Sequence, residues 1–262
     1  MRWLRAPRAV VVAALLLTAC GGSGVEGASA VGSDGTASLS GELRVFAAAS
    51  LTDAFEELAR RMEADHPDLD VVNNSASSST LATQLTEGAA ADVFASADDT
   101  QMQVVVDEGL ANGPTTFASN LLAIAVEPGN PLGITGLSDL ARDDVVLVLA
   151  APEVPAGQYA AEALQNAGVE VSPSSLEVDV RATLGKVTLG EADAAIVYAS
   201  DIVGAGDAIE GVDLPVEDDV VATYPVVALG GAPNPEAARA FVELLLGDGG
   251  QAVLADHGFG AP

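Results

Sequence analysis

The chain has 262 residues, of which 49% are hydrophobic, so it carries enough apolar side chains to bury a sizeable core. Its 38 acidic residues outnumber 10 Lys and Arg, and the resulting formal charge of −28 excludes a protein that binds the phosphate backbone of nucleic acids. The single cysteine excludes an intramolecular disulfide, a thiolate zinc site and an iron–sulfur cluster built from this chain alone.

The first 19 residues have the layout of a secretory signal peptide. Arg2, Arg5 and Arg8 precede an apolar run over residues 9–17, which is shorter than the ~20 residues of a membrane-spanning helix. The segment Leu17-Thr18-Ala19-Cys20 resembles a bacterial lipobox. We therefore expect a signal peptide over 1–19, a lipid on Cys20 and an extracytoplasmic protein anchored to the cell membrane. Residues 21–40 are rich in Gly, Ser and Ala, so residues 20–40 are predicted to be the lipidated cysteine and a flexible tether.

Three strand–helix pairs are predicted in the first part of the body. The first is a strand over 43–47 and a helix whose apolar face repeats from residue 51 to residue 62, with Ser50 as its N-cap. The second is a strand over 69–72 and a helix over about 79–87. The third is a strand over 92–96 and a helix that ends at Gly109. This alternation is typical of an α/β fold with mostly parallel sheets flanked by helices.

The second part predicts an inserted domain. A long strand over 121–126 leads into a second α/β set over 145–203, and another strand over 222–229 contains Pro225. Proline cannot donate to a sheet ladder, which favours an edge or a crossing position. Helical spacing then runs over 237–245, with Gly247 as a stop. We expect one lobe formed by 41–121 and 225–262, a second lobe formed by 122–224, and two strands that cross between them.

Two predicted turns carry the features of an anion site, whereas the common enzyme motifs are absent from the sequence. Residues 47–50 and 75–80 place small hydroxyl side chains where strands end and helices begin. Amide groups at helix N-termini bind anions, although ordinary N-capping is the alternative for each turn alone. The two histidines, His66 and His257, favour helix-end or surface roles. We expect no catalytic residue and no cofactor.

Several segments together resemble the periplasmic molybdate-binding proteins of ABC importers. They follow one another in the family's order at residues 46–54, 76–82, 91–98, 154–160, 179–181, 195–201 and 224–226. The resemblance covers residues 42–262. It implies a type II periplasmic binding-protein fold, in which two lobes close on an oxyanion.

The resemblance also implies the ligand contacts and the partners. The oxyanion contacts fall on Ser50 and Ser78 in the first lobe and on Ala156, Val180 and Tyr198 in the second. Molybdenum would be bound only as molybdate, and tungstate would bind comparably. The implied partners are a membrane permease and its ATPase, and the protein is expected to be a monomer.

A site made only of donors suits a fully deprotonated tetrahedral dianion, because a protonated phosphate needs an acceptor for its hydrogen. Three alternatives stay open. The first is a receptor for another oxyanion such as sulfate, whose rejection would depend on the size of the site. The second is an extracytoplasmic hydrolase with a serine nucleophile, and the third is a structural or adhesive lipoprotein.

Overall fold

The computed structural model describes residues 38–262. The predicted signal peptide, Cys20 and the tether up to residue 37 lie outside the described residues. The described part contains two five-stranded sheets, each flanked by helices. No helix between residues 38 and 262 combines the length and the apolar character needed to cross a bilayer.

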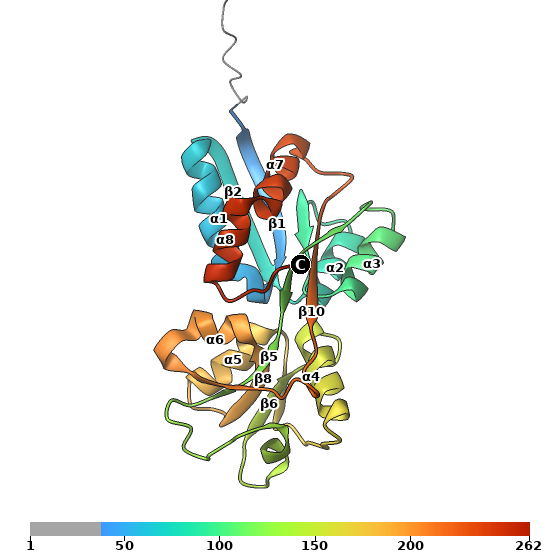
Figure 1. The fold of residues 1–262 in the computed structure, drawn as a ribbon. Coiled ribbons are helices and arrows are strands. Elements are labelled where there is room, and N and C mark those ends of the chain that lie inside the picture. Colours follow the sequence, from blue (N-terminus) through green and yellow to red (C-terminus); the bar gives the residue numbers. More distant parts are fainter. Residues whose placement is uncertain (1–37) are drawn as a thin grey trace, which may run out of the picture. The chain divides into compact units, whose positions relative to one another are not determined.

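The first lobe is built on the sheet with strand order β2-β1-β3-β10-β4 (Figure 1). Its strands are β1 (Ser40–Ala48), β2 (Asp68–Ala76), β3 (Val93–Ala95), β4 (Thr115–Asn120) and β10 (Ala222–Ala228). Its helices are α1 (Thr52–Asp65), α2 (Ser78–Thr86), α3 (Asp99–Asp107), α7 (Pro235–Leu246) and α8 (Asp248–Asp256). Helices α1, α7 and α8 cover one face of the sheet, and α2 and α3 cover the other.

The alternation of side chains along β1 explains this three-layer arrangement. Leu43 and Val45 pack in the core that contains Phe55 of α1, while Phe46 points to the opposite face and packs in the cluster that contains Leu81 of α2. Successive residues of a strand face opposite sides of a sheet, so a strand covered by helices on both faces reads as a continuous apolar run. The three predicted strand–helix pairs are confirmed.

The second lobe repeats the same architecture with strand order β7-β6-β8-β5-β9. Its strands are β5 (Leu122–Val126), β6 (Leu147–Ala150), β7 (Ser175–Glu177), β8 (Ala194–Tyr198) and β9 (Glu210–Asp213). Its helices are α4 (Pro155–Asn166), α5 (Val180–Thr188) and α6 (Ala199–Ala205), with short 3-10 turns η2 (Leu137–Ala141) and η3 (Gly206–Ala208). The predicted two-lobed α/β fold is therefore confirmed.

Two extended segments cross between the lobes. One is β4 followed directly by β5, and the other leads from β9 into β10 (Figure 1). The sheets are mixed, because β10 runs antiparallel to β3 and β4, and β5 runs antiparallel to β8 and β9. Of the expected lobe boundaries, 121/122 falls between β4 and β5, and 224/225 falls inside β10. Pro225 lies on this crossing strand, away from the sheet edge, at a register shift between Tyr224 and Pro225 that accommodates the missing donor.

Ser50 does not cap α1, so the predicted N-cap is wrong. A 3-10 turn, η1 (Ala49–Leu51), precedes the helix, and the residue at the N-cap position of α1 is Leu51. The hydroxyl of Ser50 instead lies 2.9 Å from that of Tyr224. The extra turn leaves Ser50 free to face the other lobe.

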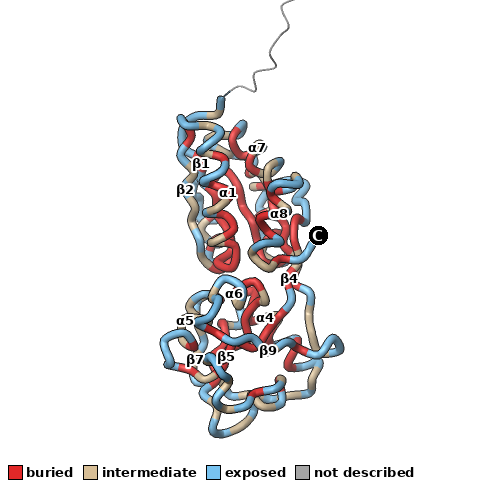
Figure 2. The backbone as a smooth tube through the Cα atoms, turned by 60° about the vertical axis from the view of Figure 1, so that its left-hand side comes forward, coloured by how far each residue is buried: buried red, intermediate tan, exposed pale blue. Residues whose placement is uncertain are grey.

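Aromatic rings form a continuous path from the first lobe to the second. Its neighbours and centroid distances are Phe241–Phe55 at 5.4 Å, Phe55–Phe117 at 6.1 Å, Phe117–Tyr224 at 6.2 Å, Tyr224–Tyr198 at 5.9 Å and Tyr198–Tyr159 at 6.5 Å. Most of these pairs are edge-on, which is the favoured geometry for aromatic side chains. Figure 2 shows buried backbone in the centre of each lobe and where the lobes meet.

The first turn of α4 lies so close to β6 that only glycine fits at position 157. A Cβ atom there would lie 2.2 Å from the carbonyl oxygen of Ala151 and 2.6 Å from that of Ala150. We predict that Gly157→Ala lowers the free energy of unfolding by about 1–3 kcal/mol or more, because the backbone must move. Urea unfolding measures this change.

Gly185 in α5 provides the matched control. It has no neighbouring atom within 4 Å of an added Cβ. Gly185→Ala should therefore raise stability by about 0.5–1 kcal/mol, as expected for a helix interior. Equal effects of the two substitutions would contradict the close approach of α4 to β6.

Candidate functional site

A small buried cavity lies where the carboxyl ends of the strands of both lobes meet. Its volume is about 10 Å³, close to the ~10–15 Å³ that one water molecule requires. The cavity is lined by Ala48, Ala49, Ser50, Ser77, Ser78, Ala97, Val154, Pro155, Ala156, Val180 and Tyr198. In open α/β sheets this edge is the usual position of a ligand.

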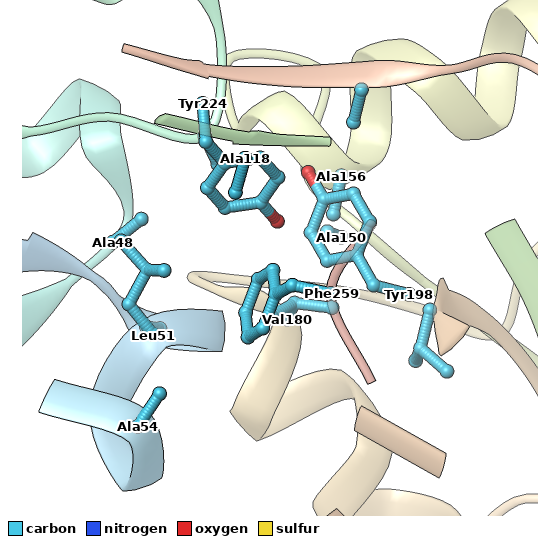
Figure 3. Packing of buried hydrophobic residues seen from close by; sticks show 14 of the residues in the cluster. Ala48, Leu51, Ala54, Ala118, Ala150, Ala156, Val180, Tyr198, Tyr224 and Phe259 are labelled. Carbon is cyan, nitrogen blue, oxygen red and sulfur yellow. The ribbon is translucent and has the colours of Figure 1, made fainter. Parts of the chain in front are cut away.

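All five residues predicted as oxyanion contacts line this cavity. Ser50 and Ser78 come from the first lobe, and Ala156, Val180 and Tyr198 come from the second. Figure 3 shows Tyr198 and Tyr224 among the packed residues Ala48, Ala156 and Val180. The structure thus brings together residues that lie up to 148 positions apart (50 to 198) in the sequence.

Helix N-termini supply the backbone donors of the cavity. Ser78 is the first residue of α2, Ala156 is the second residue of α4, and Val180 is the first residue of α5. The first amides of a helix have no partner within the helix, and the helix dipole gives this end a partial positive charge. Pro155 occupies the first position of α4, where its missing N–H costs nothing.

Three hydroxyl groups complete the set of donors. The Ser78 oxygen accepts the backbone N–H of Ala97 at 2.9 Å, and the Ser50 oxygen lies 2.9 Å from Tyr224, so each serine already has one protein partner. The Tyr198 hydroxyl is buried and has no hydrogen-bond partner among residues 38–262. A buried polar group without a partner is costly. The Tyr198 hydroxyl is therefore available to donate to a group inside the cavity.

The cavity has donors but no charged side chain in its lining. Burial raises the pKa of Tyr198 well above its ordinary value, so its phenol stays protonated and available as a donor at physiological pH. Within residues 38–262 no group of three or more His, Cys, Asp or Glu side chains is arranged to hold a metal ion. The site can therefore bind an acceptor-rich anion through neutral donors.

Arg181 connects the two lobes beside the cavity. Its guanidinium donates to the carboxylate of Asp53 on α1 and, through Nε, to the carbonyl oxygen of Ala49 at 3.2 Å. Arg181 directly follows Val180 in α5. The same helix terminus therefore contributes to the cavity and contacts the other lobe.

A second and larger cavity of about 240 Å³ lies on the other side of Ser50. Asp53, Arg181, Asp201 and His257 contribute to its lining. The carboxylates of Asp53 and Asp201 disfavour an anion in the larger cavity, whereas the lining of the smaller cavity contains no carboxylate. Burial raises the pKa of Asp201 to about 7, although its carboxylate accepts the backbone N–H of Tyr198 at 3.0 Å.

The serine–histidine pair that a hydrolase would use is absent from the described part of the chain. The Ser50 hydroxyl contacts Tyr224, and Nε2 of His257 lies 3.1 Å from a carboxylate oxygen of Glu57. His66 accepts the backbone N–H of Leu39 at 3.3 Å. Neither imidazole is bonded to a serine hydroxyl.

Sequence analysis missed the contributions of Ser77, Ala97 and Tyr224. Ser77 caps α2 by accepting the N–H of Thr80 at 3.2 Å. A run of serines before a helix predicts an N-cap but does not indicate which serine occupies the N-cap position. Tyr224 lies in a segment that resembles the family, but no local pattern indicates its contact with Ser50.

Two lobes that close on a buried cavity at the carboxyl ends of their strands define the class of two-lobed solute-binding proteins. Residues 43–260 match the family of bacterial extracellular solute-binding proteins. The molybdate-binding protein ModA of Mycobacterium tuberculosis is 38% identical over 265 residues, which cover 100% of both chains. The chain therefore belongs to the bacterial extracellular solute-binding proteins, and its resemblance to the molybdate-binding proteins is confirmed.

Solved structures show the same fold. The periplasmic molybdate-binding protein of Azotobacter vinelandii is similar with a TM-score of 0.74 at 21% identity, covering 84% of this chain and 99% of that one. The sulfate-binding protein SubI of Mycobacterium tuberculosis has a TM-score of 0.75 at 16% identity, covering 83% of this chain and 86% of that one. Family membership places the chain outside the cytoplasm.

The raised pKa of Asp201 predicts a pH-dependent stability. Between its ordinary value of 3.8 and about 7, the folded chain retains a proton that the unfolded chain releases, so this residue lowers stability as the pH rises. Asp201→Asn removes the ionisation and keeps an acceptor for the N–H of Tyr198. The unfolding free energy of the variant relative to wild type should therefore increase from pH 5 to pH 8, by up to about 1.4 kcal/mol per pH unit. Urea unfolding at several pH values measures this difference, and a constant difference would contradict the burial of the carboxylate.

Proposed function

We propose that this protein captures molybdate outside the cytoplasm and delivers it to an ABC permease and its ATPase. The observation that carries the proposal is the buried Tyr198 hydroxyl, which has no partner among the described residues and lies in a cavity of helix-terminal amides. An anion that carries only acceptors satisfies all of these donors. Charge-assisted hydrogen bonds contribute about 1.5–3 kcal/mol each, so a few of them bind a dianion without a cationic side chain.

Tungstate has the same charge and nearly the same size as molybdate, and we propose that it binds comparably. Sulfate is the second candidate. The donor set of the cavity does not distinguish sulfate from molybdate, and a sulfate-binding protein shares the fold. Selection between these anions therefore depends on the size of the closed cavity. Capture and delivery require no catalytic residue and no cofactor, and a monomer suffices.

Thermal unfolding of the purified protein with molybdate, tungstate, sulfate and phosphate in turn tests the proposal. A ligand at one hundred times its dissociation constant stabilises the folded state by about 2.7 kcal/mol. Molybdate and tungstate should raise the melting temperature and phosphate should not. A shift with sulfate alone would change the proposed ligand, and no shift with any anion would contradict an oxyanion receptor.

Tyr198→Phe is the corresponding variant. It should weaken molybdate binding about tenfold or more, because one hydrogen bond to a charged ligand is lost. Stability without ligand should be equal or higher, since the substitution removes a buried donor without a partner. Tyr159→Phe is the control, because the Tyr159 ring packs against Tyr198 but does not line the cavity. Equal titration curves for both variants would mean that the Tyr198 phenol does not contact the ligand.

We also propose that a lipid on Cys20 anchors the protein to the membrane. The proposal is based on the lipobox-like segment that ends at Cys20, which directly follows the apolar run of the signal peptide. Cys20→Ser should move the protein from the membrane fraction to the soluble fraction on cell fractionation. Persistent membrane attachment of the variant would contradict the assignment.

A further inference from the structure

The C-terminal segment, residues 257–262, follows α8 and runs to the point where the chain first crosses between the lobes. Its backbone forms an antiparallel bridge with Ser119 of β4: the N–H of Ser119 donates to the carbonyl oxygen of Gly260 at 3.0 Å, and the N–H of Gly260 donates to that of Ser119 at 2.9 Å. The Ser119 hydroxyl also donates to the carbonyl oxygen of Ala261 at 2.6 Å. Because β4 is the edge strand of the first sheet, the segment extends this edge directly before the chain enters β5.

Two side chains attach the C-terminal segment to the interior of the first lobe. Phe259 is buried, and its ring packs edge-on against Tyr224 with a centroid distance of 5.4 Å (Figure 3). Nε2 of His257 lies 3.1 Å from a carboxylate oxygen of Glu57 on α1. The Tyr224 hydroxyl in turn contacts Ser50, which lines the small cavity. The segment therefore belongs to the first lobe and supports the candidate site from behind.

Gly258 brings the same segment against the second lobe. A Cβ atom at this position would lie 2.7 Å from Cγ2 of Val203 and 3.2 Å from Cα of Ser200, both in α6. Its φ of +84° is also in the region that favours glycine. The backbone of the segment thus packs directly on α6, with no space for a side chain between them.

A hydrogen bond between β4 and α6 completes this junction. Asn120, the last residue of β4, donates from Nδ2 to the Ser200 hydroxyl at 2.8 Å. The C-terminal segment is bonded to Ser119, the preceding residue of β4, and packs on α6 at Ser200. Each of the three elements therefore contacts the other two where the chain leaves the first lobe.

From these contacts we infer that the C-terminal segment is a third link between the lobes, besides the two crossing strands, and that it slows the release of a bound oxyanion. The inference rests on the proposed function. Moving the lobes apart at the crossing strands would separate Gly258 from α6, so this contact stabilises the arrangement in which the lobes meet. An anion held by both lobes leaves only after they separate, and loss of the link therefore acts on dissociation more than on association.

Gly258→Ala tests the link, and Gly109→Ala is its matched control. Gly109 also has a positive φ, +72°, but no atom lies within 4 Å of an added Cβ, so its substitution imposes backbone strain without a contact to the other lobe. Stopped-flow mixing of the purified proteins with molybdate gives both rate constants. Gly258→Ala should raise the dissociation rate about tenfold and change the association rate less than about twofold. Gly109→Ala should leave both rates at their wild-type values.

Val203→Ala provides a rescue from the other lobe. Val203 is half-exposed, and its Cγ2 is the atom nearest to the added methyl group of Gly258→Ala. Alone, Val203→Ala should change the dissociation rate less than about twofold, whereas in the Gly258→Ala background it should lower the raised rate by about threefold or more. Additive effects of the two substitutions would contradict a contact between Gly258 and α6.

A chain that ends at His257 removes the link without adding an atom, and it should also release molybdate faster than wild type. A wild-type dissociation rate in this chain or in Gly258→Ala, or an equal increase in Gly109→Ala, would overturn the inference while leaving the proposed function intact. If wild type does not bind molybdate, the proposed function fails. Small-angle X-ray scattering then decides on the link: the radius of gyration should be larger for Gly258→Ala than for Gly109→Ala, and equal radii would overturn it.

Discussion

Where the two lobes meet, they bury hydrogen-bond donors, among them the Tyr198 hydroxyl, which has no partner within residues 38–262. The first amides of α2, α4 and α5 meet the Tyr198 hydroxyl in a cavity whose lining contains no carboxylate. Each buried donor that stays unsatisfied costs about 1–3 kcal/mol. A group that supplies acceptors to these donors would therefore stabilise the arrangement in which the lobes meet.

The ion pair between the lobes contributes little to holding them together. Arg181 reaches across to Asp53 and Ala49, but the ion pair is about two-fifths exposed on both sides. Exposed ion pairs contribute about 1 kcal/mol at most. Such a contact orients α5 but contributes little to holding the lobes shut.

The sequence allowed the architecture to be predicted because its signals are local. Hydroxyl residues that follow predicted strands pointed to Ser50 and Ser78, and the apolar repeat predicted helix α1. The repeat did not predict the 3-10 turn that removes Ser50 from the N-cap position of α1. Local signals do not predict that β5 and β10 run antiparallel to their neighbours, because the direction of a strand depends on how the chain passes between the two lobes. The Ser50–Tyr224 contact joins residues 174 positions apart. It becomes visible only when the two crossing strands are placed beside the first helix, and the resemblance to a known family named the segment without indicating its role.

The concentration of tyrosine at the junction of the lobes has a spectroscopic consequence. The chain has three tyrosines and one tryptophan, and the tryptophan is Trp3, within the predicted signal peptide. All three tyrosine rings belong to the aromatic path, with Tyr198 5.9 Å from Tyr224 and 6.5 Å from Tyr159. After removal of the signal peptide, the near-ultraviolet emission of the protein would arise almost entirely from rings beside the cavity. The body thus carries its own optical reporter of lobe movement, without an introduced label.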